Sequence, residues 1–144
     1  MYGVVAETGA QYVLMWSETI KENPVGEMMS FFKGRLEMME KAGVDVKRKV
    51  ILDPGYGFGK TVEQNYTVLA NQRRLCEFGL PVLSALSRKS MAWKLLEITP
   101  EQALPATIAM NTVAIEQGAD WIRVHDVEEA AHTVRIMQAL KDNK

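Results

Sequence analysis

The sequence predicts an α/β protein in which parallel strands alternate with helices. Two observations carry this prediction: four short apolar runs rich in β-branched residues, and a helical pattern of apolar residues after each run. The runs predict strands at 12–16, 49–53, 81–86 and 120–125. Their nearly continuous apolar character is typical of strands that are buried on both faces of a parallel sheet.

Start and stop signals place a long helix between the first two strands. Asn23 and Pro24 form a start signal, Gly43 forms a stop signal, and apolar residues recur at helical spacing between them. Ahead of the first strand, residues 1–10 resemble the end of a helix whose own strand is not in the sequence. A short additional helix is expected near 88–96.

Capping boxes predict the remaining helices; in this pattern a Ser, Thr or Asp is followed three residues later by Gln or Glu. The pairs are Thr61 with Gln64, Thr99 with Gln102, and Asp126 with Glu129. The first two of these helices are expected to end near Gly79 and Gly118. A strand followed by a helix therefore occurs four times, which is half of a (β/α)8 barrel.

Length and composition limit the classes to which this chain can belong. Its 144 residues suit a single domain, residues 1–144, and 47% apolar residues are enough for a packed core. The net charge of −1 provides no basic surface for nucleic acid, and no apolar run is long enough to span a membrane. The first residues lack a signal-peptide pattern, and the single cysteine, Cys76, suits a reducing compartment. We therefore expect a cytoplasmic protein.

The run from Asp53 to Thr61, DPGYGFGKT, resembles a phosphate-binding loop between a strand and a helix. Its spacing argues against a nucleotide site, because three residues separate Gly55 from Gly59, whereas a P-loop has four between its glycines. Two aromatic side chains inside the run are also bulky for a loop that wraps phosphate with its backbone. The run needs another explanation.

Polar residues stand at the ends of three expected strands. Asp53 ends one strand, Lys89 follows the next, and Arg123 and His125 share one face of the last. A polar residue at the carboxyl end of a barrel strand is typical of binding or catalysis, and cationic donors suit an anion, so these residues predict an anion-binding pocket. The alternatives are structural: Asp53 capping a turn, Arg123 paired with a carboxylate, His125 in the core, and Lys89 solvated at a helix start.

Three motifs, in this order and at these separations, resemble dihydropteroate synthase: DPGYGFGKT at 53–61, LSRKSM at 86–91 and RVHDV at 123–127. The segments YVLM and ITPEQAL are similar to the same family. The resemblance covers nearly the whole chain and implies the second half of a TIM barrel, with four strand–helix units. It also implies an alkyl-transferring enzyme of folate biosynthesis, which condenses 6-hydroxymethyl-7,8-dihydropterin diphosphate with 4-aminobenzoate. The products are 7,8-dihydropteroate and diphosphate.

The resemblance implies a role for each residue of the expected pocket. Asp53 corresponds to the carboxylate that binds the amino-pyrimidine edge of the pterin, and Met15 is a weaker candidate for the pterin wall. Lys89, Arg123 and His125 correspond to the catalytic residues. In this family the lysine bonds the pterin, the arginine stacks on the pterin and contacts the diphosphate, and the histidine contacts the diphosphate as well.

The aminobenzoate site is implied in the same way. Phe58 corresponds to the aromatic residue beside the ring, Ser90 to the hydroxyl near its carboxylate, and Lys89 lines the channel, which also takes sulfonamide-type analogues. The sequence departs from the family pattern at several positions. Among them, Ala85 stands where Gly is frequent, and Trp16 stands where His is usual.

The resemblance also implies a homodimer formed through the helices of this half, and Mg²⁺ held by an asparagine from the half that is not in the sequence. No metal ligand is therefore expected in this chain, and the chain alone is expected to be inactive. One alternative is a pterin-binding methyltransferase domain, which shares the barrel. The other is a non-catalytic half-barrel that associates with itself.

Overall fold

The computed structural model describes the whole chain, residues 1–144, and contains four strands at the expected positions. β1 pairs with β2 and β3 pairs with β4, both in parallel, and a parallel bridge from Leu52 to Val82 joins the two pairs. The strands therefore follow one another in chain order, and β1 and β4 lie at the two open edges. Their bounds are β1 Tyr12–Met15, β2 Val50–Asp53, β3 Leu83–Ser84 and β4 Trp121–Ile122.

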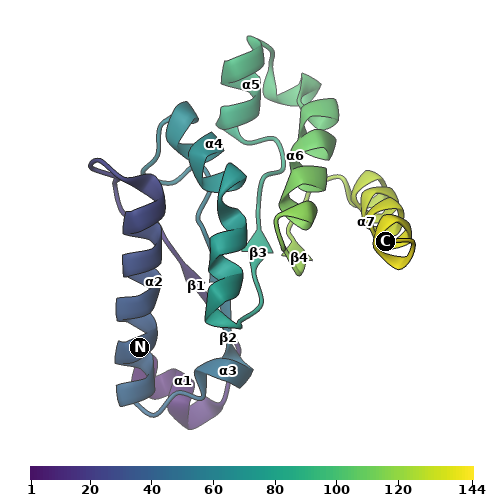
Figure 1. Cartoon of the computed structure of the whole chain (residues 1–144). Coiled ribbons are helices and arrows are strands. Elements are labelled where there is room, and N and C mark those ends of the chain that lie inside the picture. The colour runs from purple at the N-terminus through teal and green to yellow at the C-terminus, as the bar shows by residue number, and fades with distance from the viewer.

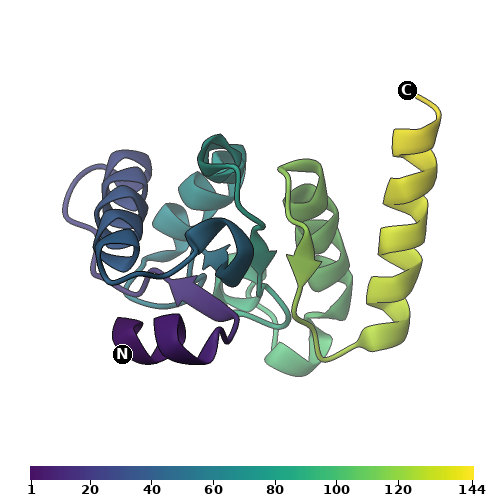
Figure 2. The same cartoon turned by 90° about the horizontal axis from the view of Figure 1, so that it is seen from below.

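The helices are arranged in chain order across the molecule. Figures 1 and 2 show α2, α4, α6 and α7 in sequence, with the amino terminus near α1 at one end and α7 at the other. None of them is both long and apolar enough to cross a membrane. Their bounds are α1 Tyr2–Thr8, α2 Pro24–Lys41, α3 Val46–Lys49, α4 Val62–Ala70, η1 Gln72–Phe78, α5 Ser90–Leu96, η2 Pro100–Gln102, α6 Leu104–Glu116 and α7 Val127–Asp142.

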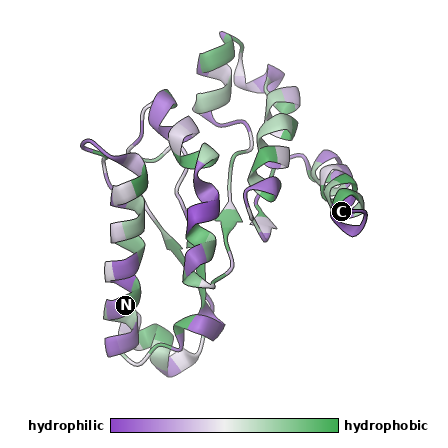
Figure 3. Ribbon diagram, in the orientation of Figure 1, coloured by the Kyte–Doolittle hydropathy of each residue, from purple (hydrophilic) through white to green (hydrophobic).

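The core lies between the sheet and the row of helices. Leu52 and Val82 from the central strands are fully buried, as are Phe32 and Met39 from α2. Figure 3 shows the central strands largely in the hydrophobic colour, whereas α2 carries both colours, as an amphipathic helix on a sheet should. Burial of the apolar face drives this packing, because each fully buried large apolar side chain contributes about 1.5–3 kcal/mol.

Two predicted helices are each divided in two. The helix expected from Thr61 to Gly79 stops at Ala70, where the Asn71 side chain donates a hydrogen bond to the Thr67 carbonyl, and the chain continues as the 3₁₀ helix η1. The helix expected to begin at Thr99 starts as the short 3₁₀ helix η2 and begins again as α6. Pro105, the second residue of α6, explains this second break, since proline lacks the N–H that a continuous helix needs.

The capping box predicted at Asp126 is wrong. The side chain of Asp126 makes no cap bond to α7. Instead its two carboxylate oxygens accept hydrogen bonds of 2.9 and 2.8 Å from the Arg88 guanidinium, which also donates to the carbonyls of Pro100 and Glu101. Arg88 thus joins the segment after β3 to the start of α7, and a bidentate pair is stronger than a local cap.

Replacing Asp126 by Asn should lower thermal stability in a pH-dependent way. The hydrogen bonds from Arg88 lower the pKa of Asp126 below its ordinary value. A depressed carboxylate pKa contributes stability above the unfolded pKa, and this contribution is lost as the pH falls through the folded pKa. The Tm difference between the wild type and Asp126→Asn should therefore be largest at neutral pH and narrow below pH ~4.

Calorimetry across this pH range provides the measurement. Asp45→Asn is the matched control, because the Asp45 carboxylate is more exposed and meets Arg48 only at 3.7 Å. This control should show a small difference at every pH. A Tm difference for Asp126→Asn that stays constant from neutral to acid pH would contradict the role given to Arg88.

Candidate functional site

The carboxyl ends of the strands bring the sequence-predicted residues to one end of the sheet. Met15 and Asp53 are the last residues of β1 and β2 and face each other in the parallel register. Lys89 directly precedes α5, and Arg123 follows β4, where its backbone N–H bonds to Ser84 of β3 at 3.0 Å. In parallel sheets ligands bind outside these carboxyl ends.

One pocket contains the three predicted catalytic residues. Lys89, Arg123 and His125 line a cavity of about 480 Å³ together with Ala85, Ser87 and Val124. The structure thus brings together side chains from the ends of two strands. Ala85 is buried and lines this pocket, so the position that departs from the family pattern is part of the pocket wall.

Ser87 is a site residue that the sequence reasoning did not single out. It is buried, and its Oγ lies 3.0 Å from Nδ1 of His125 and accepts a bond of 3.2 Å from the His125 backbone N–H. Ser87 therefore sets the orientation of the imidazole. The sequence feature that could have indicated Ser87 is its position in the segment after β3, which also contains Lys89.

Asp53 is a buried carboxylate surrounded by cations. It is 2% exposed, and its Oδ1 accepts a hydrogen bond of 2.8 Å from the Gly55 backbone N–H. Burial raises the pKa of Asp53, while the Gly55 bond and the charges of Arg123, Lys89 and Lys60 act in the opposite direction. Cations outnumber the carboxylate three to one here, so this end of the sheet favours an anion.

Phe58 and Lys89 form the other side of the site. The Lys89 ammonium lies 4.5 Å from the centroid of the Phe58 ring, which is 43% exposed, and this distance is within cation–π range. Partial burial and the charge of Arg123 lower the pKa of Lys89, and Asp53 opposes that shift. Ser90 begins α5 immediately after Lys89 and is partly exposed. An exposed aromatic face beside a cation can hold a flat ring.

The loop after β2 packs directly on the segment after β1. Gly55 has φ +66°, and a Cβ at this position would lie 1.9 Å from the Trp16 carbonyl oxygen. Trp16 is itself 1% exposed and belongs to the core. The glycines of the DPGYGFGKT run therefore serve tight turns and close backbone approach.

The sequence analysis also missed a buried glutamine, Gln72, which bonds to residues next to the site. The Gln72 carbonyl accepts hydrogen bonds from the Tyr56 hydroxyl and the Ser84 hydroxyl, and its amide donates to the Ala114 carbonyl. Gln72 thus ties the loop after β2 to β3 and α6. No local sequence pattern predicts such a residue, because its hydrogen-bond partners are distant in the sequence.

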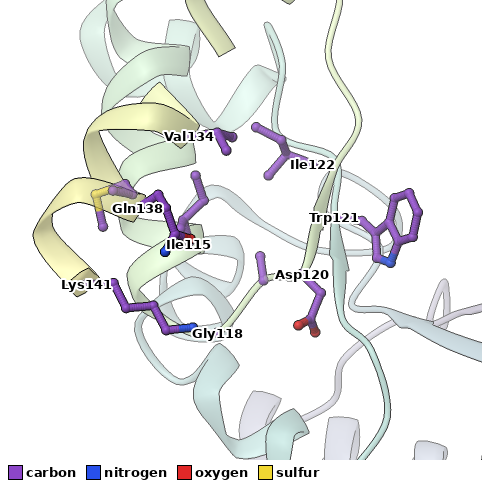
Figure 4. A pocket seen from close by; sticks show the side chains of 10 residues that line it. Ile115, Gly118, Asp120, Trp121, Ile122, Val134, Gln138 and Lys141 are labelled. Atoms are coloured by element: carbon purple, nitrogen blue, oxygen red, sulfur yellow. The ribbon is translucent and has the colours of Figure 1, made fainter. Parts of the chain in front are cut away.

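A second groove lies elsewhere on the chain and lacks this chemistry. It is formed by α6, β4 and α7, and Figure 4 shows Val134 and Ile122 pointing into it, while Trp121 points away from α7.

No group of three or more His, Cys, Asp or Glu residues in the chain could hold a metal ion. The cationic side chains at the strand ends would repel Mg²⁺. The expectation that an asparagine from the other half of the barrel holds Mg²⁺ stays a prediction.

Comparison with known proteins agrees with the geometry. The sequence profile of the family described as "Pterin binding enzyme" matches residues 1–125. The chain belongs to this family. Among curated relatives in the pterin-binding family, the dihydropteroate synthase of Escherichia coli K12 is 38% identical, over 96% of this chain and 53% of its own length. The Bacillus subtilis enzyme is 35% identical, over 97% of this chain and 50% of its own.

Solved structures of pterin-binding enzymes show the same fold. Yersinia pestis dihydropteroate synthase with a pterine–sulfa conjugate superposes with a TM-score of 0.94 at 36% identity, over 99% of this chain and 56% of that one. The Xanthomonas albilineans enzyme with 4-aminobenzoic acid gives 0.91 at 36% identity, over 97% and 55%. The chain therefore spans about half the length of the relatives it matches, and the predicted half-barrel is confirmed.

Proposed function

We propose that this chain supplies the carboxyl-terminal half of a dihydropteroate synthase site. The observation that carries the proposal is the single pocket formed by Lys89, Arg123 and His125, next to the buried Asp53 and the exposed ring of Phe58. The printed names of the matched relatives favour the synthase over the methyltransferase alternative. The single exposed cysteine suits a cytoplasmic protein.

In this proposal the Asp53 carboxylate, whose charged form the surrounding cations favour, accepts hydrogen bonds from the amino-pyrimidine edge of the pterin. Arg123 binds the diphosphate with two parallel bonds, and His125 and Lys89 add further donors. The amine of 4-aminobenzoate attacks the pterin methylene carbon as the carbon–oxygen bond to the diphosphate breaks, and the amine then loses a proton. Charge builds on the leaving diphosphate, where fixed donors stabilise the transition state.

The aminobenzoate ring is placed by the other residues. The Lys89 ammonium and the centroid of the Phe58 ring are 4.5 Å apart, and both side chains lie beside the aminobenzoate ring. Ser90 donates a hydrogen bond to the aminobenzoate carboxylate. A flat channel of this kind orients a weak aniline nucleophile toward the carbon that it attacks. The Xanthomonas albilineans structure described with 4-aminobenzoic acid supports such a channel in the family.

A chimera tests the proposed reaction. Joined to the amino-terminal half of the Escherichia coli relative, the chain should form dihydropteroate from the pterin diphosphate and 4-aminobenzoate with Mg²⁺ present. The chain by itself should show negligible turnover, because it spans about half of that relative. A folded chimera that binds pyrophosphate but forms no product would contradict the proposed activity, and turnover by the chain alone would contradict the need for a second half.

We also infer that the chain forms a homodimer. An apolar groove of about 340 Å³ lies between α4, α5 and α6, and the large side chains around it are exposed, with Leu95 at 56%, Leu96 at 52% and Val113 at 42%. Covering apolar side chains of this kind favours association. The residues of the groove are Tyr66, Leu69, Ala70, Leu95, Leu96, Ala106, Ala109, Met110 and Val113.

Light scattering at micromolar concentration should give twice the 16.2 kDa mass of one chain. Leu96→Lys should return the mass to one chain, because a charge cannot be buried in an apolar interface without a partner. Val13→Pro, on the open edge of β1, is the control, since it removes a backbone donor from that edge alone. Dissociation by Val13→Pro but not by Leu96→Lys would assign the dimer to edge pairing instead.

A further inference from the structure

The lysine of the DPGYGFGKT run, Lys60, has no role in the proposed reaction and does not line the pocket. The Nζ atom of Lys60 donates hydrogen bonds to the carbonyl oxygens of Trp16, Gly55 and Phe58, at 3.1, 3.0 and 3.0 Å. It also lies 4.3 Å from the centroid of the Trp16 ring. An ammonium group has three donors, so all three are used inside the protein.

We infer that Lys60 is a positioning residue, whose ammonium joins the loop after β1 to the loop after β2 and so places Phe58 beside Lys89. This inference rests on the proposed function only for the identity of the ligand that Phe58 meets. The hydrogen bond to Trp16 crosses between the loops, while those to Gly55 and Phe58 lie within the loop after β2.

Close contacts and further hydrogen bonds lie on both sides of Phe58 in the loop after β2. Gly59 lies so close to the first loop that a Cβ would be 2.9 Å from the carbonyls of both Ser17 and Glu18. The buried Asn65 of α4 accepts a bond of 2.8 Å from the Gly57 N–H and donates one of 2.7 Å to the Thr61 carbonyl.

Phe58 lies between these two attachments. Its N–H donates to the Gly55 carbonyl at 3.1 Å, the same oxygen that Lys60 contacts, and its own carbonyl accepts from Lys60. The backbone on both sides of the Phe58 ring is thus held by one side chain. Without the ammonium, no other donor in the chain bonds to the carbonyl of Phe58.

Burial of the Lys60 charge carries a desolvation cost. This cost distinguishes a positioning role for Lys60 from a general stabilising role. Burial lowers the pKa of Lys60 to about 8, and Asp53 only partly opposes this. A lowered lysine pKa means that the folded protein disfavours the charged form. Replacing Lys60 by an uncharged residue therefore removes a desolvation cost as well as three bonds, and the global Tm should change little while the loop loses its fixed position.

Lys60→Met tests this, because methionine has a similar length and no donor. Hydrogen exchange measured by NMR should show the Phe58 amide exchanging at least about tenfold faster than in the wild type. The ring-current shift of the Lys89 ε-protons should decrease in the same variant. Lys33→Met, an exposed lysine on α2, is the matched control and should change neither quantity.

Chemical rescue gives a second comparison. In a Cys76→Ser background, Lys60→Cys can be alkylated in denaturant to an aminoethyl-cysteine, which restores an ammonium of nearly the same reach. After refolding, the exchange rate of the Phe58 amide should return toward that of the wild type, whereas an uncharged carboxamidomethyl group on the same sulfur should not restore it. This pair of proteins also serves if Lys60→Met does not fold.

Two results would overturn the inference. One is a Phe58 exchange rate in Lys60→Met within about twofold of wild type, a change too small to report a lost bond network. The other is faster exchange throughout the chain with a lowered Tm, which would make Lys60 a general structural residue. Neither measurement uses a substrate, so failure of the proposed synthase function would leave this test intact.

Discussion

Replacing Gly55 by alanine is expected to lower the free energy of unfolding by at least about 3 kcal/mol. The backbone of Gly55 has φ +66°, which L-residues rarely adopt, and the added Cβ would lie 1.9 Å from the Trp16 carbonyl oxygen. That oxygen has little room to retreat, because the Trp16 N–H is bonded to Asp53 at 2.9 Å and its carbonyl accepts from Lys60. The midpoint of urea unfolding measures the loss.

Gly34→Ala is the control for this substitution. Gly34 lies inside α2, and a Cβ there meets nothing within 4 Å. Alanine at this position should raise the free energy of unfolding by roughly 0.5–1 kcal/mol, because it has the higher helix propensity. Equal midpoints for Gly55→Ala and the wild type would mean that the loops after β1 and β2 do not pack as described.

Replacing Arg123 by alanine is expected to weaken pyrophosphate binding to the chain by roughly 10- to 100-fold, the range that one charge-assisted contact supplies. The Arg123 side chain makes no hydrogen bond or ion pair within the chain, so its donors are free for an anion in the pocket that it shares with Lys89 and His125. Lys89→Ala should have the next largest effect. Its ammonium is already in contact with the Phe58 ring.

Titration calorimetry with pyrophosphate gives these affinities. The matched control is Arg135→Ala on α7, because Arg135 is an exposed arginine that does not line the pocket. This control should bind like the wild type. If Arg123→Ala and Arg135→Ala have the same affinity as the wild type, the anion site lies elsewhere and the proposed binding of diphosphate is wrong.

The order of strands and helices could be predicted because it depends on local patterns. Apolar runs such as 49–53 and capping boxes such as Thr61 with Gln64 act over a few residues, and the structure contains the strand and the box. Helix bounds were less predictable. Asn71 ends α4 with a side-chain bond to Thr67, and asparagine at that position looks like any other helix-surface residue in the sequence.

The site could be predicted only as a set of strand ends. Parallel pairing brings the carboxyl ends of β2, β3 and β4 to the same end of the sheet. Asp53, Lys89 and Arg123 were therefore expected to be neighbours before their geometry was known. Their roles in binding and catalysis stay predictions. The partners that hold them, such as Ser87 beneath His125, depend on distances between segments 38 residues apart.

The sequence by itself thus determined the α/β order, the family and the end of the sheet where the polar residues gather. Tertiary structure decided the partners of long side chains. Arg88 binds Asp126 across 38 residues, and Lys60 reaches back 44 residues to the Trp16 carbonyl. The physical reason is that secondary structure depends on neighbours along the chain, whereas a buried charge must find compensating groups wherever packing places them.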